Sequence, residues 1–149
     1  MTKLTFEGSP AEKPCIVDDL FSLPDRVIRI SSGGHLTAAL TSGNDIYIWG
    51  TGVAAGPLDR LWSSTPFPLD LVGQDFLDVA IGHQHVVVLT TEHKIFVMGA
   101  NESGQLGLSD KRDYTEWTEV TVVLQEQQWV TRVYAGHRNS FLLVETKTE

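Results

Sequence analysis

Short apolar runs alternate with polar turns along the whole chain. The apolar run 86–89 is separated from a second apolar run, 95–98, by the five residues 90–94. Two strand-length runs with so short a polar connection are typical of a β-hairpin. A further strand-like segment precedes each hairpin, at 26–30, 76–81 and 129–134. The pattern predicts antiparallel strands, about four in each full unit, and no helical stripe of useful length.

This strand pattern is an internal repeat. The segment that begins at Ile30 aligns without gaps with the segment that begins at Val79, and a third, shorter copy begins at Val133. Leu40 then meets Leu89, so the period between the first two copies is 49 residues. Four-stranded units at such a period predict a β-propeller, because one blade cannot bury both of its faces and must stack against its neighbours.

We therefore expect an all-β fold, a partial β-propeller of two to three blades with four antiparallel strands in each full blade. The 149 residues are expected to form a single domain, with units at about 14–65 and 66–117 and an incomplete unit at 118–149. Prolines are expected in the connections between hairpins, where a missing backbone donor does little harm to a sheet. They are Pro14, Pro24, Pro57, Pro66 and Pro68.

Glycines at equivalent positions suit this geometry. Gly33, Gly82 and Gly136 are in register in the three copies, where the innermost strands are expected to pass close to one another. A side chain at such a position would collide with the neighbouring strand. Gly50 and Gly99 are expected to end a strand in a tight turn.

One segment carries a family resemblance. Residues 99–108, which follow the apolar run 95–98, read Gly-Ala-Asn-Glu-Ser-Gly-Gln-Leu-Gly-Leu. They resemble the repeat signature of the regulator of chromosome condensation family, close to V-Y-x-W-G-x-N-x-x-G-Q-L-G, and residues 82–90 resemble its G-x-x-H-x-x-A-L-T element. Leu36 and Asn139 stand where His85 stands in the second copy, so the copies are degenerate. Structural roles in the repeat are expected for Gly33, Gly50, Gly82, His85, Gly99, Asn101, Gly104, Gln105, Leu106, Gly107 and Gly136.

The resemblance implies a ring of seven blades, whereas 149 residues make about three blades at most. An open arc exposes strand edges and one blade face, which are liabilities in water. We therefore expect further blades, a partner or self-association to complete the propeller.

Charge and composition narrow the classes of partner. The chain has 11 Lys and Arg residues against 19 Asp and Glu residues, a net charge of −8, so a nucleic-acid partner is not expected. No apolar run is long enough to cross a bilayer, and the first residues lack the apolar segment of a signal peptide. We expect a protein of the cytoplasm, the nucleus or both, without a membrane partner. Cys15 is the only cysteine, which excludes an intramolecular disulfide and a cysteine-based zinc site.

Few residues could carry chemistry. His83, His85 and His137 could meet as zinc ligands from neighbouring blades. The favoured alternative is that His85 hydrogen-bonds the backbone of its own blade while His83 and His137 lie on a loop or rim. Cys15 has no activating neighbour, and the chain has no nucleophile motif, phosphate loop or dinucleotide fingerprint. We expect no catalytic residue, no metal and no cofactor, so the chain is not expected to be an enzyme.

Two of the four tryptophans, Trp62 and Trp117, suggest an interaction surface instead. Trp49 and Trp129 fall in strand patterns and are expected to pack between blades, whereas two others lie in connecting segments beside charged residues. Aromatic and arginine side chains on loops are typical of protein-interface hot spots. The candidate interaction residues are Arg60, Trp62, Lys111, Arg112, Tyr114 and Trp117. The alternative, which we favour, is that these are ordinary solvated loops with each Trp packed on a blade edge.

The sequence therefore favours a non-catalytic protein-protein interaction module or regulatory scaffold. The resemblance to the family implies an alternative, guanine-nucleotide exchange on a small GTPase. Each hypothesis calls for a protein partner, and nothing in the residues selects which protein it is.

Overall fold

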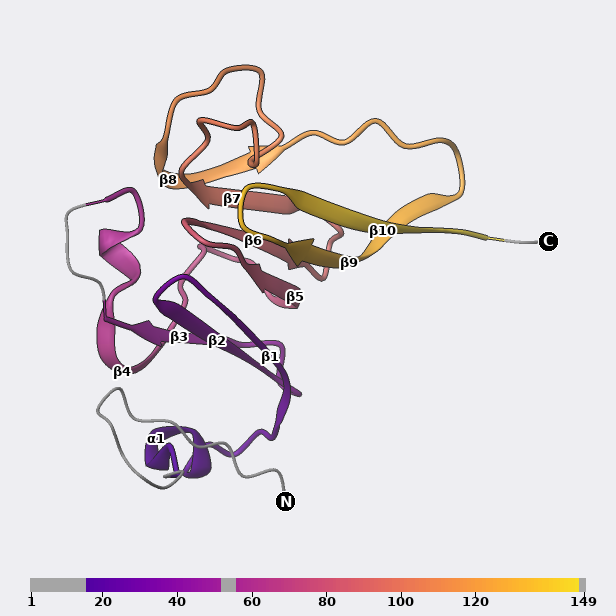
Figure 1. Ribbon diagram of the computed structural model, residues 1–149. Helices are drawn as coiled ribbons and strands as arrows, with labels where there is room; N and C mark the ends of the chain where they lie inside the picture. The colour runs from indigo at the N-terminus through magenta and orange to yellow at the C-terminus, as the bar shows by residue number, and fades with distance from the viewer. Residues whose placement is uncertain (1–15, 52–55, 148–149) are drawn as a thin grey trace.

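The computed structural model describes residues 16–51 and 56–147, so Cys15 lies outside the described residues. The described chain contains two four-stranded antiparallel sheets and one two-stranded sheet. In Figure 1 the second four-stranded sheet lies above the first, and the two-stranded sheet overlaps the second in this view. The first blade is β1 (Val27–Gly33), β2 (Leu36–Thr41), β3 (Ile46–Gly50) and β4 (Ser63–Pro68). The second is β5 (Phe76–Ile81), β6 (His85–Thr90), β7 (Ile95–Gly99) and β8 (Tyr114–Val120). The third has β9 (Gln128–Ala135) and β10 (Ser140–Thr146).

The strands of each full blade hydrogen-bond in sequence order, as the hairpin pattern predicts. The expected all-β arc of four-stranded blades is thus confirmed. Helical structure in the described chain is limited to α1 (Asp18–Phe21) and the short 3-10 helix η1 (Asp59–Leu61).

Two details of the sequence prediction are wrong. The unit boundaries expected after residues 65 and 117 fall inside β4 and β8, so each full unit ends later in the chain. Pro66 and Pro68 lie within β4 rather than in a connection. Because β4 is the outermost strand of its sheet, a proline there can leave the ladder intact.

The core consists of two apolar layers between the blades. Alternate residues of β2 and β3, such as Leu40 and Ile48, pack against Val86, Val88 and Met98 of the second blade. The opposite face of the second blade carries a second layer, which contacts β9 and β10. This alternation is why β5, β6 and β7 read as nearly continuous apolar runs, because both faces of the middle sheet are buried.

The two outer faces of the arc are more exposed to solvent than the faces between the blades. On the third blade, Tyr134, Phe141 and Leu143 keep 46%, 59% and 45% of their surface. Trp49 lines a hollow on the outer face of the first blade, and Trp129 lines a cavity together with Leu143. Neither tryptophan belongs to a core layer between the blades, so the expectation that they pack there is wrong.

Candidate protein-interaction face

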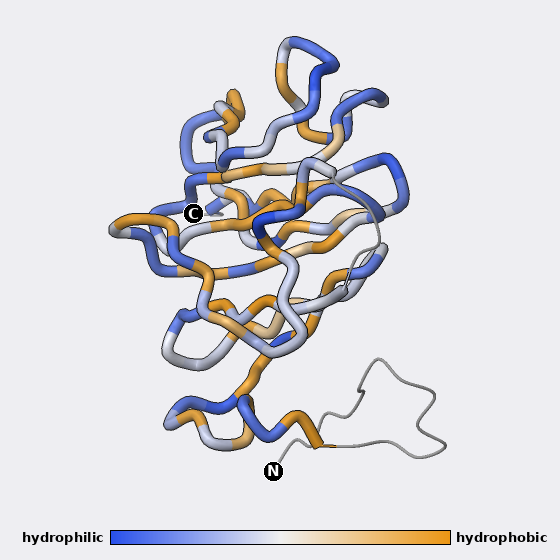
Figure 2. Tube along the Cα trace, turned by 90° about the vertical axis from the view of Figure 1, so that its left-hand side faces the viewer, coloured by the Kyte–Doolittle hydropathy of each residue, from blue (hydrophilic) through white to orange (hydrophobic). Residues whose placement is uncertain are grey.

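Because the strands are antiparallel, the connections that follow the odd-numbered strands lie at one end of the arc. The hairpin turns after β1, β5 and β9 lie at this end, together with the segments after β3 and β7. We call it the loop end and define it by residues 34–35, 56–62, 82–84, 100–113 and 136–139. The arrowhead of β7 points to it in Figure 1, and Figure 2 looks directly onto it. Several of its turns are coloured as hydrophilic in that view.

Glycines let the blades approach closely here. A Cβ atom at Gly33 would lie 2.5 Å from the carbonyl oxygen of Ile81 and 2.6 Å from that of Gly82. A Cβ atom at Gly82 would lie 2.8 Å from the carbonyl oxygen of Gly136. The innermost strands of adjacent blades therefore meet backbone to backbone at the loop end, which leaves no room for a side chain.

The glycines at the end of the third strand of each full blade are constrained by their backbone φ angles and by the neighbouring strand. Gly50 and Gly99 have φ angles of 151° and 126°. A Cβ atom at Gly99 would lie 2.9 Å from the Cβ of His85, its partner across the ladder. Each glycine is followed by a long connection rather than by the tight turn that we expected.

The signature loop after β7 is held by its own side chains. Asn101 Nδ2 donates to the carbonyl oxygen of Asp110 at 2.7 Å, and its Oδ1 accepts from the N–H of Leu106 at 3.0 Å. Gln105 Oε1 accepts from the N–H of Ser103 at 2.9 Å. These bonds place the Leu106 side chain in the core layer between the second and third blades. The loop is therefore a built scaffold rather than a loose connection.

His85 joins the second blade to the third. It is fully buried, and its Nε2 lies 2.9 Å from Ser140 Oγ, which in turn donates to the carbonyl oxygen of Gln105 at 2.8 Å. Ser140 Oγ is left to accept from His85, so Nε2 carries the proton. The expectation that His85 bonds the backbone of its own blade is wrong, because its partner is a side chain of the next blade. Burial lowers the pKa of His85.

Stability is expected to depend on the protonation of His85. Its pKa in the folded chain lies below the ordinary value of 6.5. Between these two values the unfolded chain binds a proton that the folded chain does not. The His85 contribution should therefore be complete above about pH 6.5 and decline as the pH falls below it. Urea unfolding of the wild type and His85→Gln from about pH 5 to 8 measures this, and a constant difference between them would contradict it.

The other two histidines form a pair. The rings of His83 and His137 are stacked with their centroids 4.3 Å apart and an interplanar angle of 23°. Stacked rings do not point their nitrogens at one ion, and within residues 16–51 and 56–147 no three His, Cys, Asp or Glu side chains are grouped as metal ligands. The zinc hypothesis for His83, His85 and His137 has no support from this arrangement.

The candidate interaction residues divide into two groups. In the first group, Trp62 and Trp117 pack against the core layer between the first two blades, and Arg60 forms an ion pair with Glu116 of β8. Trp117 lies within β8, not on a loop. These contacts join the outer rims of the two blades, so this group stabilises the arc.

The second group lies at the end of the signature loop and the start of β8: Lys111 and Arg112 are exposed, whereas Tyr114 is the half-buried first residue of β8 and packs against the core layer between the second and third blades. The Arg112 guanidinium lies 4.8 Å from the centroid of the Tyr114 ring, and its Nε is 2.9 Å from Asp110 Oδ2. Tyr114 Oη also donates to the Asp110 carboxylate at 3.1 Å. The nearby Tyr114 and Asp110 raise the pKa of Arg112. Lys111 and Arg112 thus present two cations on one loop of the loop end, beside the Tyr114 ring at the start of β8.

The sequence analysis missed one buried ionic group. Asp78 is fully buried, and its Oδ1 lies 2.6 Å from Arg29 Nε. Its two carboxylate oxygens also accept the N–H groups of Val79 and Val133, each at 2.9 Å. The group spans three blades, because Arg29 lies on β1, Asp78 on β5 and Val133 on β9. Arg29 and Asp78 occupy equivalent repeat positions, so opposite charges in register were the available sequence signal.

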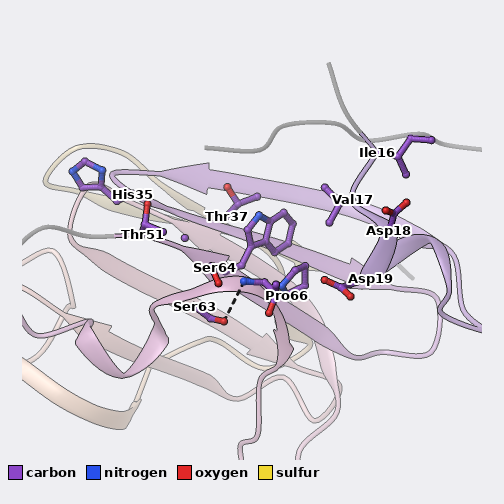
Figure 3. A pocket seen from close by; sticks show the side chains of 13 residues that line it. Ile16, Val17, Asp18, Asp19, His35, Thr37, Thr51, Ser63, Ser64 and Pro66 are labelled. Atoms are coloured by element: carbon purple, nitrogen blue, oxygen red, sulfur yellow. Dashed lines mark hydrogen bonds between the residues drawn. The ribbon is translucent and has the colours of Figure 1, made fainter. Parts of the chain in front are cut away.

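A hollow of about 470 Å³ lies on the outer face of the first blade. Thr37 and Trp49 line it, and Figure 3 shows Thr37 on the sheet and Asp18 and Asp19 on the other side of the hollow. Its lining includes Asp18, Asp19 and His35, but these residues form no ion pair and no group of metal ligands. It therefore offers no chemistry comparable to the loop end.

No helix of the described chain is long and apolar enough to cross a membrane.

Comparison with known proteins places these features in a family. A sequence model of the regulator of chromosome condensation (RCC1) repeat matches residues 76–105, which cover β5, β6, β7 and the first part of the signature loop. The regulator of chromosome condensation of Drosophila melanogaster is 32% identical over 114 residues, 72% of this chain and 20% of the relative. The probable E3 ubiquitin-protein ligase HERC4 of Homo sapiens is 32% identical over 97 residues, 62% of this chain and 9% of the relative.

The crystal structure of Prp20p from Saccharomyces cerevisiae is similar in fold, with a TM-score of 0.71 at 21% sequence identity. The match covers 97% of this chain and 36% of Prp20p, whose binding properties to Gsp1p and histones were described with that structure. The chain thus spans about a fifth of the fly relative and about a third of the yeast structure.

Proposed function

Because this chain is a partial member of the regulator of chromosome condensation repeat family, we propose that it is a non-catalytic protein-protein interaction module or regulatory scaffold. Its binding surface in this proposal is the loop end, with the exposed residues Lys111 and Arg112 and the adjoining half-buried Tyr114 at its centre. The partner is another protein, and the cytoplasm or the nucleus is the expected compartment.

The signature loop is the observation that carries this proposal. Internal hydrogen bonds of Asn101 fix the loop before any partner arrives, so little ordering entropy is lost on binding. Arg112 and Tyr114 are residue types enriched at binding hot spots, and their mutual contact holds both side chains in place. Ubiquitin-ligase activity in the name of one relative belongs to a protein of which this chain matches 9%, and it gives no reason to propose catalysis here.

The triple variant Lys111→Ala, Arg112→Ala, Tyr114→Ala tests the role of the loop end. We expect it to weaken capture of the bound protein by about tenfold or more, since loss of one or two hot-spot side chains costs about 2 kcal/mol. Quantitative affinity purification with the wild type and the variant measures the change. The control is Glu92→Ala, Lys94→Ala, an exposed ion pair at the opposite end of the second blade. Equal loss in both variants would contradict the proposal.

A small GTPase is the alternative partner, because the similar yeast structure was described together with its binding to Gsp1p. Release of a fluorescent guanine nucleotide from such a GTPase, with and without this chain, separates the alternatives. Accelerated release that the triple variant abolishes would make the chain an exchange factor. Binding without acceleration would keep it as a scaffold.

A further inference from the structure

A small cavity opens between the first two blades at the loop end. Its volume is about 120 Å³, and its lining comes from the β1–β2 hairpin, the segment 56–62 and the turn after β5. A cavity of about 150 Å³ takes one benzene molecule, so this one has room for a single apolar side chain. We call it the interblade pocket and define it by Leu36, Leu58, Trp62, His35, His83 and Gln84.

The interblade pocket is apolar inside and polar at its mouth. Leu36 and Leu58 keep only 3% and 7% of their surface, and Trp62 is half-buried against the core layer between the two blades. The other three residues, His35, His83 and Gln84, are exposed, so their polar groups lie on the solvent side. Ligand sites commonly combine such an apolar floor with a few polar groups that orient the ligand.

The groups at the mouth favour an anion. The turns after β1, β5 and β9 contain three histidines and Arg138 but no acidic residue. The His83 ring stacks on that of His137, and within the described chain Arg138 has no ion-pair partner. The carboxylate of Asp59, in the neighbouring segment, accepts the N–H of Gly56 at 2.6 Å. The imidazole and amide N–H groups at the mouth are donors that a carboxylate can accept.

The walls of the interblade pocket are fixed before a ligand arrives. The N–H of Leu61 donates to the Leu58 carbonyl at 2.9 Å, and the Gln84 carbonyl accepts the N–H of Ala100 at 2.7 Å. A preformed site loses little ordering entropy on binding. The connection after β3 lacks the Gly-Gln-Leu-Gly run of the signature loop, so the pocket is built from residues of the first copy rather than from the repeat signature.

We propose that the interblade pocket binds the C-terminal residue of a partner polypeptide, an apolar residue with a free carboxylate. The apolar side chain packs on Leu36 and Leu58, and the carboxylate accepts from the donors at the mouth. In a polypeptide, one residue carries both an apolar side chain and a carboxylate only at the C-terminus. Capture of a C-terminal carboxylate is a recurring mode of peptide recognition. The inference rests on the proposed function of the loop end, because it names the part of the partner that docks there.

Titration of the isotope-labelled 149-residue chain with the peptide acetyl-Gly-Ser-Gly-Ser-Leu tests the pocket by nuclear magnetic resonance. We expect saturable shifts of the Trp62 indole N–H and of the Gln84 amide. The same peptide with a C-terminal amide should bind at least about tenfold more weakly, since it lacks the charged acceptor. A free acid that ends in glycine should lose a similar factor, because no side chain then fills the floor.

Variants of the chain separate the interblade pocket from the rest of the loop end. The double variant His35→Ala, His83→Ala should weaken the free acid by about tenfold and leave the amide nearly unchanged, a difference that misfolding would not produce. The control Glu92→Ala, Lys94→Ala, at the opposite end of the second blade, should bind both peptides as the wild type does. The loop-end triple variant should change peptide affinity by less than about twofold.

The outcomes distinguish this inference from the proposed function. If the triple variant abolishes partner capture while no peptide binds, the pocket proposal fails and the loop-end function stands. Equal binding of the acid and the amide, or the absence of a saturable shift at Trp62, would also overturn it. So would tighter binding of acetyl-Gly-Ser-Glu-Ser-Gly amide, because the pocket would then bind an acidic side chain within a chain rather than a C-terminus.

Discussion

Asp78→Ala is expected to lower the free energy of unfolding by about 3–5 kcal/mol, the largest loss of any single substitution considered for this chain. The alanine would leave the Arg29 guanidinium, whose side chain is 23% exposed, without its anion. It would also leave the N–H groups of Val79 and Val133 without their acceptor. Buried donors without partners lose the full cost of their desolvation. Guanidinium unfolding followed by circular dichroism measures the loss.

Two further variants separate the buried group from a general effect of charge. Asp75→Ala removes an exposed carboxylate just before the same strand and should change the free energy of unfolding by less than about 0.5 kcal/mol. Arg29→Met leaves the fully buried Asp78 carboxylate with its two N–H donors but without its cation, so it should be destabilising as well. If Asp78→Ala were no worse than Asp75→Ala, the carboxylate would have no role in joining the three blades.

The repeat made most of the fold predictable. Strand period, hairpin spacing and an offset of 49 residues depend on local sequence, and they predicted two full blades and a partial third one. The ends of the blades were less predictable. Pro66 and Pro68 look like breakers in the sequence, but the outermost strand of a sheet tolerates proline on its exposed edge. The end expected for the first unit, after residue 65, therefore falls inside β4.

The candidate site was harder to predict, because its decisive contacts lie between blades. Sequence placed His85 on a strand, but only packing of the third blade brings Ser140 to its Nε2. The same limit applies to Arg60, whose partner Glu116 lies in the next blade. Residue type alone could not separate Arg60, which pairs with the next blade, from Arg112, which pairs within its own loop.

Gly33→Ala is expected to destabilise the chain by about 3 kcal/mol through the spacing of the first two blades. Its Cβ atom would lie 2.5 Å and 2.6 Å from two carbonyl oxygens, those of Ile81 and Gly82. Both are backbone atoms of the next blade and cannot rotate away, so the innermost strands must separate. Urea unfolding gives the loss, and faster exchange of the Ile81 amide, which donates to Ser31 Oγ at 2.8 Å, should accompany it.

Gly73→Ala is the matched control for this steric argument. Gly73 has a φ of 73°, and a Cβ atom there would meet nothing within 4 Å. Its substitution should cost about 1–2 kcal/mol through backbone strain alone and leave the Ile81 amide unchanged. Gly33 bears no such φ restriction in this fold, so its cost is the collision itself. A Gly33→Ala chain with wild-type stability and a protected Ile81 amide would mean that adjacent blades can move apart at the axis, and close backbone contact would then not be what holds the arc together.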